Sequence, residues 1–136
     1  MQHLTYRGAV LTWECDSNGH LNVMYYINRY ELAGRNLMPK IGLEKAYMKS
    51  NNYGIAVIEQ HIRYVKEVFE DDLLYIESTV QDHTRKVITL FHELRNGSNE
   101  EIVGTCEVKL VLLDKLNRKA VLLPARVRKL LDEISA

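Results

Sequence analysis

A turn near the start of the chain gathers three side chains that could take part in acyl transfer. Residues 13–26 read W-E-C-D-S-N-G-H-L-N-V-M-Y-Y, so that Asp16, His20 and Asn22 fall close together. Asp, Ser, Asn and Gly favour a turn because they hydrogen-bond locally or tolerate a positive φ. Asn22 is also a good N-cap for the helical pattern that follows it. A carboxylate, an imidazole and a carboxamide are therefore predicted to lie just ahead of a helix N-terminus.

That position suits the attack on a carbonyl group. The first N–H groups of a helix lack partners within the helix and carry a partial positive charge. They can hold the oxyanion that forms on a carbonyl under attack, and losing one such donor typically costs about 10²–10³ in rate. A carboxylate such as Asp16 can attack the carbonyl or activate a water. The residues alone leave a structural alternative, in which Asp16 bonds its own turn, Gly19 supplies a positive φ and Asn22 only caps the helix.

Composition limits the classes of function. The 136 residues fit a single domain, residues 1–136, and eighteen basic residues balance eighteen acidic ones, which argues against nucleic acid or a membrane as the main partner. No signal-peptide pattern and no apolar run of transmembrane length is found. Cys15 and Cys106 lack metal-ligand spacing, and no two of the five histidines share it. We therefore expect a cytoplasmic protein with free thiols, no metal and no cofactor.

The hydrophobic pattern predicts a strand and then a long helix. Residues 4–14 are rich in β-branched and aromatic residues, as strands are. Residues 22–38 show a helical stripe, with Arg29 and Arg35 on the opposite side, and Pro39 ends the helix. The stripe consists of Tyr26, Ile27, Tyr30, Ala33 and Leu37. This helix is apolar over much of its girth and is therefore expected to lie inside a sheet.

Four strands are predicted to follow, after a short helix over residues 43–49. Strand patterns cover residues 55–69, 74–80, 87–95 and 102–113, and Pro124 begins an amphipathic C-terminal helix. The tight connections between these strands predict antiparallel pairing. We therefore predict an α+β fold in which a curled antiparallel sheet wraps around one long central helix, with a further helix at the C-terminus.

The stretch D-S-N-G-H-L-N, followed by Y-Y-I-N-R-Y-E, resembles the hotdog-fold acyl-CoA thioesterases of the 4-hydroxybenzoyl-CoA thioesterase/YbgC type. Members of that family carry a D-x-x-G-H-x-N turn before their central helix. The resemblance continues through I-E-Q-H-I-R-Y-V-K-E-V-F-E-D-D-L, H-T-R-K-V-I-T-L and K-L-N-R-K-A-V-L-L-P-A-R-V-R, and so covers nearly the whole chain. It implies a hotdog dimer, or a tetramer of such dimers, whose active sites lie between subunits. It also implies hydrolysis of an acyl-CoA to a free acid and CoA, with no cofactor other than the CoA of the substrate.

The resemblance also assigns roles to residues. Asp16 matches the catalytic carboxylate, as nucleophile or general base, and the region of Val23 matches the helix N–H that polarises the thioester oxygen. His20 and Asn22 match motif positions and are assigned to orienting the turn, the water or the substrate. Many members have a second Asn in place of Val23 and an Asp in place of Glu14, so a side-chain role at position 23 is lost while the backbone N–H remains.

Five basic residues, of which Arg85 and Lys86 lie on a probable loop, are candidates for binding the phosphates of CoA, since charge-assisted contacts to phosphate are strong. These candidates are Arg63, Arg85, Lys86, Arg118 and Lys119. Each of them alone is more often a solvated charge. The aromatic residues of the first half of the chain would suit an aromatic or cationic acyl group if some of them line the acyl pocket.

Other functions remain open at this point. A hotdog dehydratase or isomerase would act on acyl thioesters with the same fold, and a non-catalytic protein would bind acyl-CoA without turnover. Glu31 and Glu59 are weaker candidates for a second acid, and a structural hydrogen bond is the simpler role for each. Release of free thiol across a panel of acyl-CoAs separates these alternatives.

Overall fold

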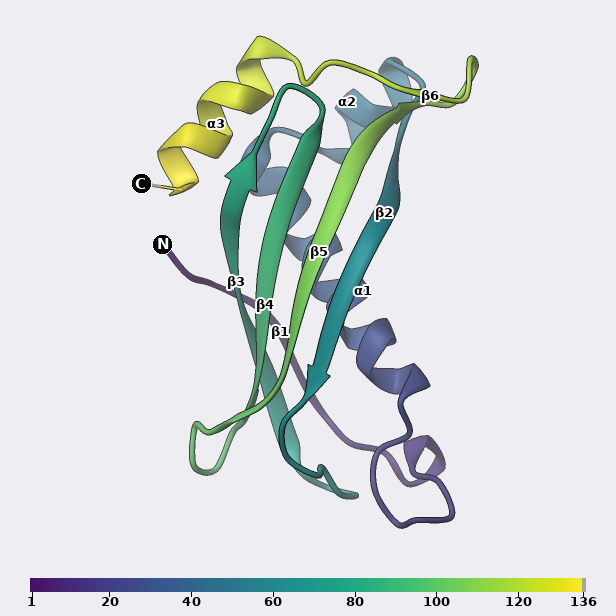
Figure 1. Cartoon of the computed structure of the whole chain (residues 1–136), viewed down its shortest axis with the longest axis vertical. Coiled ribbons are helices and arrows are strands. Elements are labelled where there is room, and N and C mark those ends of the chain that lie inside the picture. The colour runs from purple at the N-terminus through teal and green to yellow at the C-terminus, as the bar shows by residue number, and fades with distance from the viewer. Residues whose placement is uncertain (136) are drawn as a thin grey trace.

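The core of the fold is a curved antiparallel sheet. The computed structural model describes residues 1–135, and five long strands follow the order β1-β3-β4-β5-β2 across the sheet (Figure 1). The strands are β1 (His3–Ala9), β2 (Tyr53–Tyr64), β3 (Leu73–His83), β4 (Val87–Asn96) and β5 (Ile102–Asp114). A short strand, β6 (Lys119–Ala120), pairs with β5. All of these pairings are antiparallel, as the tight connections predicted.

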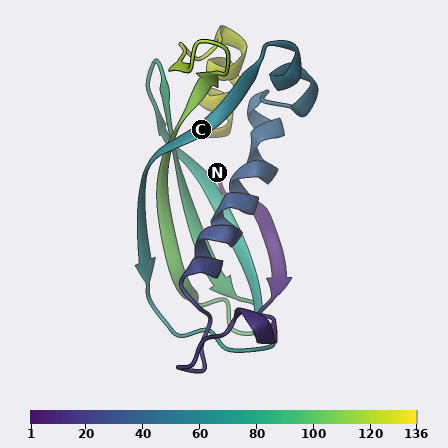
Figure 2. The ribbon, with the colours of Figure 1, turned by 90° about the vertical axis from the view of Figure 1, so that its right-hand side faces the viewer.

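The long helix α1 (Met24–Leu37) lies across one face of this sheet, and the strands bend around it (Figure 2). Four members of the predicted stripe are buried against the sheet: Tyr26, Tyr30, Ala33 and Leu37. The fifth, Ile27, is 46% exposed. The predicted α+β architecture, a curled antiparallel sheet around a central helix, is therefore confirmed.

Two predicted strands are shorter than the pattern indicated. Strand β1 ends at Ala9, and Thr12–Glu14 forms a 3-10 turn in which the Glu14 carboxylate accepts the Leu11 N–H at 2.8 Å. Strand β2 ends at Tyr64 because the N–H groups of residues 65 and 66 both donate to one acceptor, the Val103 carbonyl, at 2.9 and 3.1 Å. Because two donors share this one carbonyl, the hydrogen-bond ladder between β2 and β5 ends here and the chain turns away from the sheet.

The two ends of the sheet carry different structures. The segment 10–23 lies at the end where α1 begins (Figure 1). The opposite end carries α2 (Lys45–Ser50), the β3–β4 loop and α3 (Ala125–Ser135). A 3-10 turn, Met38–Ile41, continues α1 and packs against α3, which also covers part of β3. Within residues 1–135, no helix is long and apolar enough to cross a membrane.

Candidate functional site

The Asp16 turn is held on both sides by backbone hydrogen bonds. The Gly19 N–H donates to the Asp16 carbonyl at 2.9 Å, and the Asp16 N–H donates to the His20 carbonyl at 3.0 Å. Gly19 has a φ of +86°, a left-handed conformation that costs glycine little. The buried Leu21 donates its N–H to the Val68 carbonyl at 2.7 Å and so fastens the turn to the segment before β3. The turn therefore presents its side chains from a fixed backbone.

The Asp16 carboxylate has polar partners on both oxygens and is 22% exposed. Its Oδ1 accepts the Asn18 N–H at 2.9 Å, and its Oδ2 accepts the Asn22 carboxamide at 3.4 Å. His20 Nδ1 lies 3.9 Å from Oδ2 and bonds the Leu21 carbonyl at 3.0 Å. That carbonyl, followed by the negative charge of Asp16, raises the pKa of His20. The structure thus brings three of the predicted residues together around an accessible carboxylate.

The start of α1 leaves one backbone donor free. The Asn22 side chain accepts the Met24 N–H at 3.1 Å, which agrees with its predicted capping role, although Val23 already has helical dihedral angles. The Tyr25 N–H bonds the Asn22 carbonyl, and the Tyr26 N–H bonds the Val23 carbonyl. Within residues 1–135, the Val23 N–H has no acceptor. It is therefore the first-turn donor that a substrate carbonyl can use.

A buried ion pair, not foreseen from the sequence, holds this region against the helix. Arg29 Nη2 lies 2.7 Å from Glu14 Oε1, and the two side chains are 2% and 6% exposed. The guanidinium also donates to the Tyr25 and Ala9 carbonyls. The sequence placed Arg29 on the side of the helix opposite the apolar stripe but gave no sign of this pairing, because its partner is fifteen residues away. Burial alone would raise the pKa of Glu14, but the Arg29 guanidinium and the Leu11 N–H lower it.

A groove of about 570 Å³ runs beside α1, between the helix and strands β2, β4 and β5. We call it the α1–β2 groove. Its volume falls within the range of small-molecule sites, roughly 300–1,000 Å³. Most of its lining is apolar and includes Ile27, Met38, Ile55, Val57, Leu90 and Val108. Ile27 follows Val23 by four positions, about 6 Å along the helix, so the groove begins close to the free N–H.

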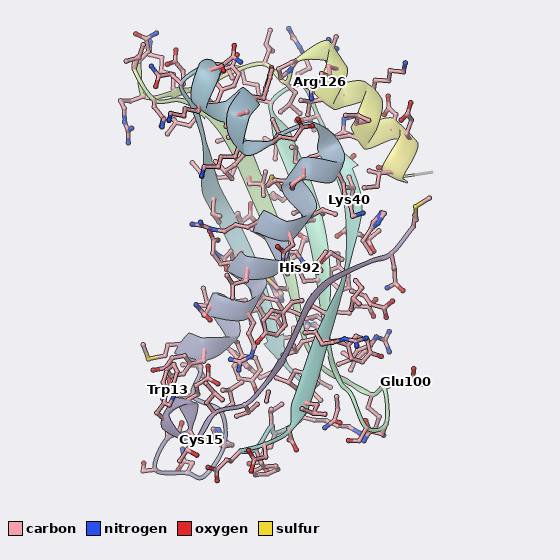
Figure 3. All side chains as sticks on the ribbon, turned by 180° about the vertical axis from the view of Figure 1, so that it is seen from behind. Trp13, Cys15, Lys40, His92, Glu100 and Arg126 are labelled. Atoms are coloured by element: carbon pink, nitrogen blue, oxygen red, sulfur yellow. The ribbon has the colours of Figure 1, made fainter. Side chains whose placement is uncertain are left out.

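The basic candidates lie at both ends of the molecule. Arg63 is near the end of β2, on the side where α1 begins. Arg85 and Lys86 lie on the β3–β4 loop, as predicted, at the opposite end, together with Lys119, the first residue of β6, and Arg118 just before it. Figure 3 shows the same separation through Trp13 and Cys15 at one end and Arg126 at the other. Within one chain, the structure therefore brings only Arg63 to the end that carries Asp16.

Within the described part of the chain, no three His, Cys, Asp or Glu side chains come together in a way that could hold a metal ion.

Comparison with known proteins gives a family match over most of the chain. A family model described as the thioesterase-like superfamily matches residues 10–131. A betainyl-CoA thioesterase of Pseudomonas aeruginosa is 29% identical over 107 residues, which cover 79% of this chain and 67% of that protein. An L-carnitine dehydrogenase/betainyl-CoA thioesterase of Agrobacterium fabrum is 28% identical over 121 residues. The match covers 89% of this chain but only 25% of the Agrobacterium protein.

Solved structures share the fold over almost the full chain. A Staphylococcus aureus protein solved in complex with CoA has a TM-score of 0.86 at 19% identity, over 99% of this chain and 85% of that one. The probable thioesterase YbaW of Escherichia coli has a TM-score of 0.82 at 21% identity, over 98% of this chain and 100% of that one. A 1,4-dihydroxy-2-naphthoyl-CoA thioesterase of Synechocystis has a TM-score of 0.83 at 13% identity, over 100% and 99% of the two chains. At these identities the likeness concerns the fold, and it confirms the expected hotdog architecture.

Proposed function

Because the chain belongs to the thioesterase-like superfamily, we propose that it is an acyl-CoA thioesterase in which Asp16 is the reacting carboxylate. Thioester hydrolysis, the expected class of reaction, is confirmed at the level of the family. One observation carries the assignment of the site: an accessible carboxylate on a fixed turn lies just before a helix whose Val23 N–H is free.

The chemistry follows from these two groups. The Val23 N–H donates to the thioester oxygen and stabilises the negative charge that develops there. Asp16 either attacks the carbonyl carbon or takes a proton from the water that does so. In the first case the carbon–sulfur bond breaks to leave an acyl anhydride on Asp16, which water then hydrolyses to the free acid and the Asp16 carboxylate. In the second case the water oxygen joins the acyl carbon directly and the carbon–sulfur bond breaks. In both cases CoA leaves with a proton on its sulfur. The Asn22 carboxamide, bonded to Asp16 Oδ2, orients the carboxylate, and the His20 ring flanks it.

A second copy of the chain is part of this proposal. Among residues 1–135, strand β2 pairs only with β5, so its outer edge is open along twelve residues. Ile55, Val57 and Ile58 on this strand are all at least 36% exposed. A long edge strand with exposed apolar residues is a site for pairing with another strand. We therefore assign the open edge to β2 of a second copy, related by a two-fold axis.

This dimer explains why the basic residues lie far from Asp16 in one chain. Pairing about a two-fold axis perpendicular to the sheet makes the two β2 strands antiparallel. The second copy is then inverted end to end, so that its β3–β4 loop approaches the Asp16 end of the first chain. Arg85 and Lys86 of one copy would bind the CoA phosphates of a substrate that reacts at Asp16 of the other.

Mixing two inactive variants tests this shared site. We expect Asp16→Asn alone and Arg85→Ala/Lys86→Ala alone to hydrolyse substrate poorly when its concentration lies below KM. After co-expression, random pairing gives hybrid dimers with one intact site, so about a quarter of the wild-type activity returns. Light scattering on the wild-type protein checks the dimer directly. Activity no greater than the sum of the two variants, or a monomer at micromolar concentration, would contradict the arrangement.

Thiol release from a panel of acyl-CoAs tests the activity itself. The panel contains short, long, aromatic and cationic acyl groups, with betainyl-CoA among them because the two curated relatives are named for it. We expect stoichiometric free thiol and free acid from at least one member, without added metal. Binding without thiol release would identify an acyl-CoA binding protein, and a formed or shifted double bond would identify a dehydratase or isomerase.

A further inference from the structure

A chain of hydrogen bonds crosses three neighbouring strands of the sheet and ends on a histidine that lines the α1–β2 groove. Thr5 on β1, Ser78 on β3 and His92 on β4 are all at most 4% exposed. Thr5 Oγ1 and Ser78 Oγ are 2.7 Å apart, and Ser78 Oγ lies 2.6 Å from His92 Nδ1. Thr5 Oγ1 also donates to the Ile76 carbonyl at 3.3 Å. Three strands thus contribute one continuous polar relay inside an apolar core.

The direction of this relay determines which ring nitrogen carries the proton. A hydroxyl has a single hydrogen to donate, and the Thr5 hydroxyl lies within reach of two acceptors, the Ile76 carbonyl at 3.3 Å and the Ser78 oxygen at 2.7 Å. With the Thr5 hydrogen on the Ile76 carbonyl, Ser78 donates to Thr5 and its oxygen accepts from His92 Nδ1–H, whereas with that hydrogen on Ser78 the relay runs the other way and Ser78 donates to Nδ1. Burial lowers the pKa of His92 to about 4, so the ring is neutral near pH 7. In the first of these two arrangements, the other nitrogen, Nε2, keeps a free lone pair.

His92 lines the α1–β2 groove, where its ring stacks on Tyr30 with 5.9 Å between the ring centroids. Figure 3 places it midway along the molecule, behind α1. Tyr30 follows Met24, the first residue of α1, by six positions, which is about 9 Å along the helix. Within residues 1–135, no donor bonds His92 Nε2. A group bound in the groove is the partner that this acceptor lacks.

We propose that His92 is a specificity-determining residue whose Nε2 accepts a hydrogen bond from a hydroxyl or N–H group on the distal part of the acyl group. This inference rests on the proposed thioesterase function and concerns the same site. An alkyl chain without a donor leaves Nε2 unpaired in the groove. A quaternary ammonium, which has no N–H, also gives this nitrogen nothing to accept, so the acceptor favours a substrate other than a betainyl thioester.

Pairs of acyl-CoA substrates that differ by one hydroxyl group measure the effect of His92 on substrate preference. Acyl-CoAs of increasing chain length are compared with and without a terminal hydroxyl, and kcat/KM is determined for each. We expect the wild-type protein to prefer the hydroxylated member by about tenfold at the length that reaches His92, as one neutral hydrogen bond allows. His92→Phe keeps an aromatic ring beside Tyr30 and leaves Ser78 bonded to Thr5, and it should reduce that preference to about onefold. No preference at any length, or an unchanged preference in His92→Phe, would overturn the proposal.

A second measurement does not depend on turnover or on that variant. Nitrogen-15 NMR of the labelled wild-type protein should show Nε2 without a proton, and its resonance should shift when a non-hydrolysable thioether analogue with a terminal hydroxyl binds. The same analogue without the hydroxyl should leave it unshifted. Ser78→Ala removes the group that fixes the tautomer. It should therefore lessen the difference between the two analogues in the shift of the Nε2 resonance. A protonated Nε2 in the free protein would refute the inference, whereas absence of thiol release from every acyl-CoA would refute only the proposed function.

Discussion

Replacing Asp16 with asparagine should lower kcat by about 10²–10⁴-fold, the usual contribution of a positioned acid or base. A carboxamide neither attacks a thioester nor takes a proton from water, whichever of the two roles Asp16 has. The Val23 N–H is untouched, so substrate binding should change little and the loss should appear in kcat rather than KM. Steady-state thiol release on the best member of the acyl-CoA panel measures this effect. Turnover near the wild-type rate would reject Asp16 as the reacting group.

The fold should survive this change. The Asn18 N–H, which Asp16 Oδ1 accepts at 2.9 Å, can bond the carboxamide oxygen of the new side chain equally well. The 3.4 Å contact to the Asn22 carboxamide and the negative charge 3.9 Å from His20 Nδ1 are lost, which together we expect to cost less than about 1 kcal/mol of unfolding free energy. Asn18→Ala is the matched control in the same turn because only the backbone of Asn18 bonds the carboxylate. It should retain nearly full activity, and thermal unfolding compares the stability of all three proteins.

Features that depend on neighbouring residues could be predicted from the sequence. The Asp16 turn, the helix start after Asn22 and the hairpin after Asn96 follow from local hydrogen bonding, and the structure contains all three. The buried stripe of α1 follows from its period, and four of its five members are buried. Ile27 is the exception, and it borders the α1–β2 groove, where a bound acyl group or a second copy can cover it.

Features built from distant residues could not be predicted. A strand pattern gives no information on which strands are neighbours, so the relay from Thr5 through Ser78 to His92 requires the sheet order. Arg85 and Lys86 were predicted on a loop, but the distance of the basic residues from Asp16 depends on which end of the sheet each of them occupies. The helical period placed Arg29 on the side of its helix opposite the apolar stripe, and it could not show what that side contacts. Its burial depends on a carboxylate on another segment.

That buried pair leads to the second large effect, which is on stability. Arg29→Met should reduce the unfolding free energy by about 3–5 kcal/mol, because it leaves the Glu14 carboxylate buried without its counter-ion. The same substitution at Arg35, whose pair with Glu31 is exposed on the same helix, should cost less than about 1 kcal/mol. Denaturant unfolding of the two variants compares them directly. Equal losses of unfolding free energy in Arg29→Met and Arg35→Met would show that burial does not increase the cost of breaking the ion pair at Glu14.

The pH dependence of Arg29→Met distinguishes an unpaired charge from a simple packing defect. In the wild-type protein the pKa of Glu14 is lowered, so its contribution to stability is present above the unfolded-state pKa and is lost as the pH falls. Without Arg29, burial raises the pKa of this carboxyl above its unfolded-state value, so the variant regains stability as the pH falls and the carboxyl takes up a proton. The difference in unfolding free energy between the variant and the wild-type protein should therefore become smaller toward acidic pH. A simple packing defect would leave that difference independent of pH.

The same pair is also connected to the Asp16 turn, because the Glu14 carbonyl accepts the Asn22 N–H at 2.9 Å. Replacing both partners, in Glu14→Leu/Arg29→Met, removes the buried charge and should recover much of the stability that Arg29→Met loses. The apolar pair does not reproduce the bonds from Arg29 to the Ala9 and Tyr25 carbonyls, which join β1 to the first turn of α1. If the ion pair also positions the turn, the double variant should regain unfolding free energy, while its kcat should be lower than that of the wild-type protein and its KM the same. Recovery of both the unfolding free energy and kcat in the double variant would limit the ion pair to a structural role.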